Sequence, residues 1–160
     1  MIAQMQAAIR ASAGNPEQAF AEATAAAREV AERFEAGRRS FISVATYPDA
    51  AAGVADGPLT GCIYSVKDNI DIAGQVTTCG SRALEDAPPA VEDAWIVSAL
   101  KRAGAICVGK NTLHEFALGA TGKNLRFGDT PNPFDSSRHV GGSSGGSTIA
   151  VAEGEVHLAI

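Results

Sequence analysis

A short segment rich in glycine and serine contains the residue types in this sequence best suited to chemistry. Residues 141–147 read Gly-Gly-Ser-Ser-Gly-Gly-Ser. Glycines permit unusual backbone angles and let a bound group come close to the main chain. An apolar stretch typical of a helix follows from Thr148, and the free N–H groups at a helix start can bind a ligand. The segment is therefore a candidate active-site loop.

Three other interpretations of this loop are weaker. A flexible linker is disfavoured because an apolar helix, not polar chain, follows it. A Walker-type phosphate loop requires a lysine after its last glycine, and Ser147 stands there instead. A nucleophile elbow, with Ser144 at the centre of Gly-x-Ser-x-Gly, requires a preceding hydrophobic strand, whereas residues 135–139 are polar and turn-like.

Lys67 is the second residue whose position suggests chemistry. Residues 62–66 alternate like a strand, and Lys67 stands where this strand ends. Alone, such a lysine is usually a solvated surface charge. To accept a proton near neutral pH it must be buried enough to lower its pKa from the ordinary value of about 10.4. The carboxylate of Asp68 would act in the opposite direction if it faced the same site.

Lys67 and the glycine loop belong to a longer pattern that spans roughly a hundred residues. The pattern resembles the amidase signature family of serine amidohydrolases, in the order and spacing of that family. The stretches that carry the resemblance are residues 59–71, 77–81, 93–111, 114–116, 121–124, 127–128, 132–135 and 141–147. The resemblance implies an amide-bond hydrolase that converts a carboxamide and water to a carboxylate and ammonia or an amine.

The family uses a Ser–cis-Ser–Lys triad, and two of its members have matching positions here. Lys67 matches the lysine and Ser143 the bridging serine, preceded by a cis peptide bond that would be Gly142–Ser143. Ser144 is the second choice for the bridging role. The nucleophilic serine of the family lies well downstream, so we expect it beyond Ile160. We therefore expect these 160 residues to be a truncated part of the catalytic domain.

The resemblance also suggests where substrate binds. Phe116, Gly119 and Thr121 match a stretch that borders the acyl pocket in the family, and Ser144 is expected to contact substrate as well. Core packing of Phe116 and Leu118 explains that stretch equally well. The family needs no metal or cofactor.

The elements that must position these residues follow an α/β pattern. Strands are expected at residues 41–46, 62–66 and 105–109, and helices within 1–36, at 92–103 and from 148 onward. Asn15 and Pro16 start a helix after Gly14. That helix has an apolar stripe formed by Phe20, Ala23, Ala27, Val30, Ala31 and Phe34.

We therefore predict an α/β, amidase-signature fold, with a mixed central sheet flanked by helices. An N-terminal helical segment would span residues 1–40, and the first part of the catalytic domain residues 41–160. Residues 121–139 are expected to be a long irregular segment, and such segments are often functional.

Composition excludes several other classes of protein. The net charge is −5 and no basic run occurs, which argues against a nucleic-acid partner. No apolar stretch is long enough for a membrane span. The three cysteines show no CxxC spacing, so neither a disulfide framework nor a zinc site is expected. His114, His139 and His157 also lack the spacing of metal ligands, and Cys79 is interpreted as a buried structural thiol.

These observations favour a cytoplasmic enzyme that acts on a small-molecule amide, with a homodimer left possible. Two alternatives remain open. One is a glutamine-dependent transamidase subunit within the same class. The other is a non-catalytic fragment of the fold that serves as a binding or structural module.

Overall fold

One mixed sheet forms the centre of the fold. The computed structural model describes residues 15–35, 39–45 and 56–160. Within them the strand order is β1-β3-β2-β4, and β2 runs parallel to both of its neighbours while β1 is antiparallel to β3. The strands are β1 (Phe41–Val44), β2 (Ile63–Lys67), β3 (Ile106–Asn111) and β4 (Leu158–Ala159). This is the α/β architecture that the sequence predicts.

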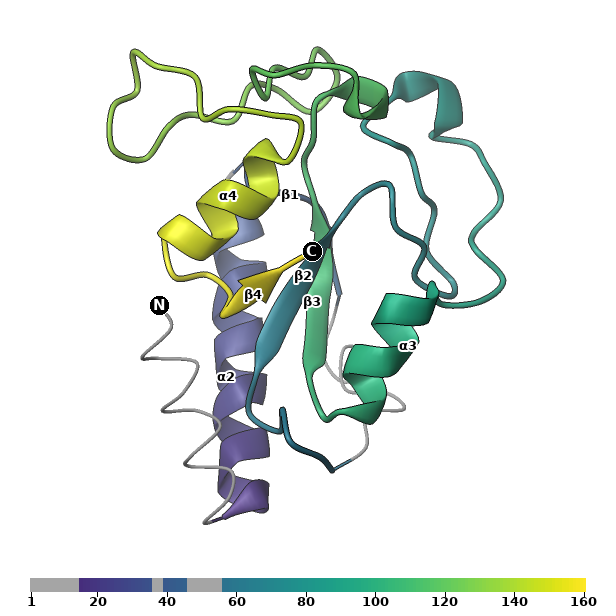
Figure 1. The fold of residues 1–160 in the computed structure, drawn as a ribbon, viewed down its shortest axis with the longest axis vertical. Coiled ribbons are helices and arrows are strands. Elements are labelled where there is room, and N and C mark those ends of the chain that lie inside the picture. The colour runs from purple at the N-terminus through teal and green to yellow at the C-terminus, as the bar shows by residue number, and fades with distance from the viewer. Residues whose placement is uncertain (1–14, 36–38, 46–55) are drawn as a thin grey trace.

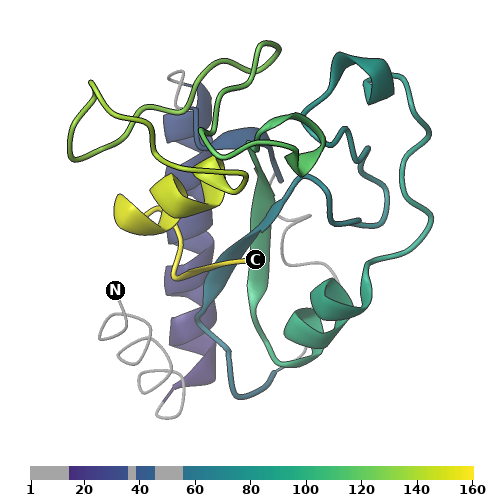
Figure 2. The same cartoon turned by 45° about the horizontal axis from the view of Figure 1, so that its top comes forward.

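Helices cover both faces of this sheet (Figures 1 and 2). The α-helices are α2 (Pro16–Glu35), α3 (Trp95–Arg102) and α4 (Gly145–Ala152), and two single turns of 3₁₀ helix are η2 (Arg82–Leu84) and η3 (Glu115–Ala117). Helices α2 and α4 share one apolar cluster with the sheet, whereas α3 packs in a second cluster on the other face. No helix in the described ranges is long and apolar enough to cross a bilayer.

Helix α2 begins as the sequence predicts. The side chain of Asn15 accepts a hydrogen bond from the backbone N–H of Gln18 at 3.1 Å, which satisfies one free donor of the first turn. The middle of the expected stripe, Ala23, Ala27 and Val30, is buried against the sheet. Residues 1–14, and with them the first expected helix, lie outside the described residues, as does the side chain of Phe20.

The pleat of β2 separates the two apolar clusters. Ile63 packs in the cluster of α2 and α4, whereas Tyr64 and Val66 pack in the cluster of α3. Successive side chains of a strand point to opposite faces. Lys67 therefore belongs to the same face as Ile63, which is the face that α4 covers.

Several element boundaries differ from the sequence prediction. Helix α3 begins at Trp95 instead of residue 92, because Asp93 accepts hydrogen bonds from the backbone N–H of Ala73 and from Lys101 before the helix starts. Strand β3 extends to Asn111, two residues further than expected. Helix α4 begins at Gly145, inside the glycine loop, where Thr148 N donates to Ser144 O at 3.0 Å.

The long segment of residues 121–139 is irregular, as expected. It contains no helix or named strand, and a single β-bridge joins Pro131 to His139. One buried side chain anchors its start: Asn124 Nδ2 donates to Gly80 O at 2.9 Å and to Leu113 O at 2.8 Å.

The strand expected at residues 41–46 ends at Val44 in the structure, and residue 46 lies outside the described ranges.

Candidate active site

Lys67 and Ser143 meet above the carboxyl end of β2. The Nζ atom of Lys67 donates a hydrogen bond to Ser143 Oγ at 2.5 Å, although the two residues are 76 positions apart in sequence. Both side chains are partly buried. The structure thus brings together the two residues that the resemblance assigned to the triad.

The glycine loop reaches this position because it packs against the residues that follow β3. The Gly142–Ser143 peptide bond is cis, as the resemblance implies. The backbone of His114 donates to Ser143 O at 2.9 Å, and Gly146 donates to Thr112 O at 3.0 Å. A Cβ atom at Gly146 would lie 2.4 Å from Ser40 O, so this contact requires glycine.

The environment of Lys67 favours a neutral amine. Burial lowers the pKa of Lys67 from its ordinary value. On the main chain, Lys67 N donates to Ile160 O at 2.6 Å, next to β4. A neutral amine that contacts the Ser143 hydroxyl can take the proton of that hydroxyl. Chemically, the pair can therefore act as a base whose proton acceptor is the lysine and whose relay is the serine.

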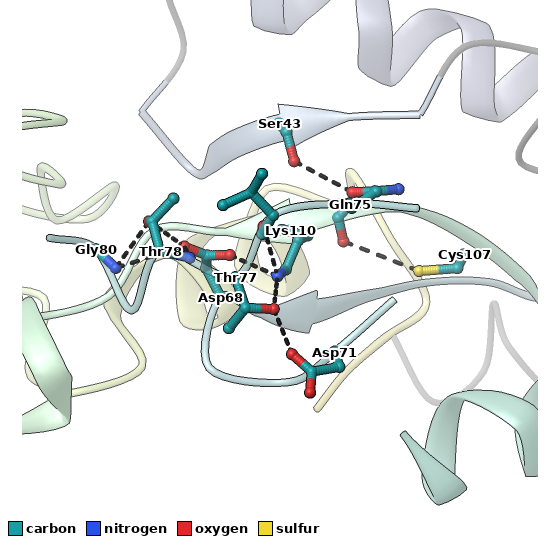
Figure 3. A network of polar contacts seen from close by, with 11 residues as sticks. Ser43, Asp68, Asp71, Gln75, Thr77, Thr78, Gly80, Cys107 and Lys110 are labelled. Atoms are coloured by element: carbon teal, nitrogen blue, oxygen red, sulfur yellow. Dashed lines mark hydrogen bonds and ion pairs between the residues drawn. The ribbon is translucent and has the colours of Figure 1, made fainter. Parts of the chain in front are cut away.

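Asp68 does not face the pair. It is fully buried, and its Oδ1 lies 2.7 Å from the Nζ atom of Lys110, which is also fully buried. Figure 3 shows this ion pair inside a network with Thr77 and Thr78. Lys110 was not among the residues singled out from the sequence. The signal in the sequence was a charged residue directly after the apolar run of residues 105–109, and the structure shows that β3, which includes Lys110, is buried throughout.

The predicted substrate-binding residues lie near the glycine loop. A Cβ at Gly142 would lie 2.7 Å from Gly119 O, so the two segments are in close contact. Thr121 Oγ1 is 3.4 Å from His114 Nδ1. Ser144 occupies the N-cap position of α4, but its side chain makes no capping hydrogen bond. Their role in substrate binding stays a prediction.

The predicted core packing of Phe116 and Leu118 is wrong. Phe116 is 46% exposed and Leu118 is 83% exposed. The backbone explains this exposure, because Phe116 has a φ of 51° and the chain turns away from the core there. The other explanation, a position beside a substrate pocket, is implied by the family resemblance and stays a prediction for Phe116.

Histidine and cysteine side chains form no metal centre in the part of the chain that the structure describes. His157 Nδ1 accepts a hydrogen bond from Ile63 N at 3.1 Å, and His139 is exposed. Cys79, predicted from the sequence to be a buried thiol, is only partly buried.

Comparison with known proteins agrees with this geometry. A family model described as Amidase matches residues 17–160. A glutamyl-tRNA(Gln) amidotransferase subunit from Halobacterium salinarum is 49% identical, over 68% of this chain and 25% of the relative. The corresponding protein from Methanospirillum hungatei is 48% identical, over 73% of this chain and 26% of the relative. The chain thus spans about a quarter of the length of these relatives.

Solved structures show the same likeness. The corresponding glutamyl-tRNA(Gln) amidotransferase subunit from Thermotoga maritima superposes with a TM-score of 0.81 at 35% identity, covering 97% of this chain and 32% of that one. The peptide amidase of Stenotrophomonas maltophilia gives a TM-score of 0.74 at 33% identity, covering 86% of this chain and 32% of that one. A family match over residues 17–160, relatives of this identity and the shared fold lead to one conclusion: the chain belongs to the amidase family.

Proposed function

We propose that this chain supplies the lysine and the bridging serine of an amide-cleaving active site. The observation that carries the proposal is the 2.5 Å hydrogen bond between Lys67 Nζ and Ser143 Oγ. The substrate is a carboxamide, and the products are a carboxylate and ammonia or an amine. The attacking hydroxyl belongs to a serine outside residues 1–160.

The proton path follows from this hydrogen bond. As the nucleophilic hydroxyl attacks the amide carbon, its proton passes to Ser143 Oγ while the proton of Ser143 passes to the neutral amine of Lys67. The resulting ammonium group returns a proton through Ser143 to the leaving amine, and the C–N bond breaks. Water then releases the carboxylate by the same relay, which restores the starting protonation states.

Replacement of the base tests the proposal. Turnover is measured as ammonia released from simple carboxamides by the natural polypeptide that carries this sequence. Lys67→Ala is expected to lower kcat/KM by about 10²-fold or more, because general base catalysis contributes that much. Lys123→Ala removes an exposed lysine and is the matched control, with unchanged turnover expected. Turnover retained by Lys67→Ala contradicts the proposal.

The names of the relatives favour one variant of this activity. Both the Halobacterium and the Methanospirillum relative are named as parts of a glutamyl-tRNA(Gln) amidotransferase. In this variant the amide is the side chain of glutamine, and the released ammonia is passed on to a charged tRNA with the help of partner subunits. Glutamine preferred over other small carboxamides, with turnover stimulated by a glutamylated tRNA, supports the amidotransferase. Rapid hydrolysis of simple aliphatic amides without tRNA supports the plain amidase.

The third possibility is a non-catalytic module, and residues 1–160 assayed alone address it. Ammonia release by this chain from simple amides would exclude such a module. If the natural polypeptide also fails to release ammonia from glutamine and from simple amides, the binding or structural role is favoured.

A further inference from the structure

The buried ion pair between Asp68 and Lys110 has no part in the proton path described above, yet it is adjacent to it. Asp68 directly follows Lys67 in the chain, and its backbone N–H donates to Asn111 O at 3.1 Å. Both residues of the pair are fully buried. A buried ion pair contributes little net stability and often less than an apolar pair of similar size. Its position therefore calls for another explanation.

Each charge of the pair is held in place by the loop that follows β2 (Figure 3). Lys110 Nζ donates to Val76 O at 3.1 Å and to Thr77 Oγ1 at 2.7 Å. Asp68 Oδ2 accepts hydrogen bonds from the hydroxyl and the N–H of Thr78. Its other oxygen, Oδ1, accepts no hydrogen bond from the described residues and has the Lys110 ammonium group 2.7 Å away. Removing Lys110 would leave that oxygen uncompensated.

A β-bulge in β3 brings Lys110 to the side of Asp68. Tyr64 of β2 is in register with Cys107, but Val66 is in register with Lys110, so β3 has one extra residue between these pairs. Residues in register on neighbouring strands share a face of the sheet. The extra residue thus turns Lys110 away from the face of Lys67 and onto the face of Val66 and Asp68.

The two charges of the pair shift the pKa of a neighbouring thiol in opposite directions. Besides burial, the carboxylate of Asp68 raises the pKa of the Cys79 thiol and the ammonium group of Lys110 lowers it. For Lys67, burial is the cause of the lowered pKa. An unopposed carboxylate next to Lys67 would stabilise its ammonium form and raise its pKa. The Lys110 ammonium group, 2.7 Å from Asp68 Oδ1, has the opposite charge and opposes such an effect.

We propose that Lys110 is a positioning residue for Lys67: by neutralising Asp68 and fixing the loop of residues 76–80, it lets Lys67 exist as a neutral amine. The catalytic relevance of this role rests on the proposed function. The effect on the protonation state of Lys67 does not rest on it, because that state is measured without turnover.

The test substitutes none of the other titratable groups on the segments around Lys67. Asp71 accepts a hydrogen bond from Thr77 Oγ1 at 2.6 Å, and Glu115 accepts one from Ser81 Oγ at 2.5 Å. His114 has its ring beside Thr121, and Cys79 lies on the loop that Lys110 holds.

Lysine NMR measures the effect directly. Residues 1–160 contain four lysines, at positions 67, 101, 110 and 123, whose ¹³Cε signals can be followed through a pH titration of the natural polypeptide that carries this sequence. The Lys67 signal is the one that disappears in Lys67→Arg. In Lys110→Met the pKa of Lys67 is expected to rise by about one unit, since a buried carboxylate is left unopposed. In Asp68→Asn it is expected to fall, since the Lys110 charge is then unopposed.

Two further variants separate charge from structure. Asp68→Asn combined with Lys110→Met removes both charges, and the pKa of Lys67 is expected to return to the value of the unaltered protein. Lys101→Met breaks another Lys–Asp pair of the same length, 2.7 Å to Asp93 on the α3 side of the sheet, and is expected to leave Lys67 unchanged.

The signs of the shifts decide the outcome. A purely structural role predicts that both single substitutions move the pKa of Lys67 in the same direction, and that result overturns the proposal, as does an unchanged pKa in folded Lys110→Met. If Lys110→Met does not fold, Asp68→Asn and the double variant decide. A lowered Lys67 pKa in Asp68→Asn and a restored Lys67 pKa in the double variant support the proposal. Any other result overturns it. Loss of turnover in Lys67→Ala is a separate measurement, so each hypothesis can fail alone.

Discussion

Ser143 and Ser144 are adjacent and chemically identical, but their surroundings differ. Ser143 Oγ accepts the hydrogen bond of Lys67, whereas the backbone carbonyl of Ser144 begins the hydrogen bonding of α4. If Ser143 relays the proton, Ser143→Ala is expected to lower kcat by about 10²-fold or more. Ser144→Ala should cost less than a tenth of that, since no hydrogen bond of its side chain caps the helix. Steady-state kinetics of the two variants compares them, and equal losses would contradict the assignment.

The lowered pKa of Lys67 has a consequence for the pH profile. Only the neutral amine accepts a proton, so kcat/KM is expected to increase as pH rises through the pKa of Lys67. Because burial lowers that pKa, the acidic limb of the profile should lie below the ordinary lysine value of about 10.4. Activity measured from about pH 5 to 10 tests this. A limb that stays in place when Asp68→Asn is introduced would assign it to another group.

At this scale the sequence identifies part of the candidate site and misses Lys110. The family resemblance assigns Lys67 and Ser143 to the triad, and the structure joins them by a hydrogen bond. Lys110 was missed for a physical reason. Alternation along β3 would put it on the face of Ile106 and Val108, and only the extra residue before it reverses its direction. A single-sequence pattern does not reveal a bulge.

Among the elements, the start of α4 depends most on the absence of a side chain. A Cβ at Gly146 would lie within 2.6 Å of three backbone atoms of Ser40 and Thr112. Gly146→Ala is therefore expected to lower the free energy of unfolding by about 3 kcal/mol, the upper end for overpacking, because backbone atoms move less easily than side chains.

Gly154→Ala is the matched control for this substitution. Its Cβ would meet no atom within 4 Å, and only its φ of 73° is unfavourable for alanine, at a cost of about 1–2 kcal/mol. Urea denaturation gives both values. The Lys67 titration should change in Gly146→Ala alone, because Gly146 holds the loop that contains Ser143. Equal effects on Lys67 would show that the contact with Thr112 does not position the loop.

The same contact explains the error in the start of α4. From sequence, four glycines in seven residues indicate a loop, since glycine disfavours helix by about 1 kcal/mol per residue relative to alanine. In the structure Gly145 and Gly146 are helical because the close approach of Gly146 to Ser40 and Thr112, next to β1 and β3, outweighs this preference. Tertiary packing of this kind is not visible in local sequence.

On the scale of the whole molecule, α2 and the sheet form one core. Ala23, Ala27 and Val30 pack in the same cluster as Phe41 and Ile63. The predicted boundary near residue 40 thus separates two segments that share a core, and the independence of the N-terminal segment stays a prediction.

An overpacking substitution in this core tests whether the helix and the sheet unfold together. Ala27→Leu is expected to lower the free energy of unfolding by about 1–3 kcal/mol in a single transition. Ala25→Leu, on the exposed side of the same helix, should stay within about 0.5 kcal/mol. Denaturation followed by far-ultraviolet circular dichroism gives the values. Two separate transitions would mean that α2 belongs to a different unfolding unit.

The overall architecture followed from the sequence because its signals are strong over whole elements. The apolar stripe of α2 and the alternation of β2 each predict an element that the structure contains. The sequence analysis predicts a mixed sheet through the family resemblance. It predicts neither the strand order nor the antiparallel direction of β1 beside β3, since pairing partners distant in sequence leave no local pattern.

The irregular segment of residues 121–139 joins the two halves of the candidate site through an exposed part of the chain. Arg138 lies in it with 78% of its side chain exposed. A tryptic cut after Arg138 would put Lys67 and Ser143 on different polypeptides. The piece that follows Arg138 would keep β4, which pairs with β2, and Gly146, which contacts Thr112. Cleavage there is expected to leave a nicked complex in which the hydrogen bond between Lys67 and Ser143 persists, so that two separately expressed fragments can be combined to rebuild the site.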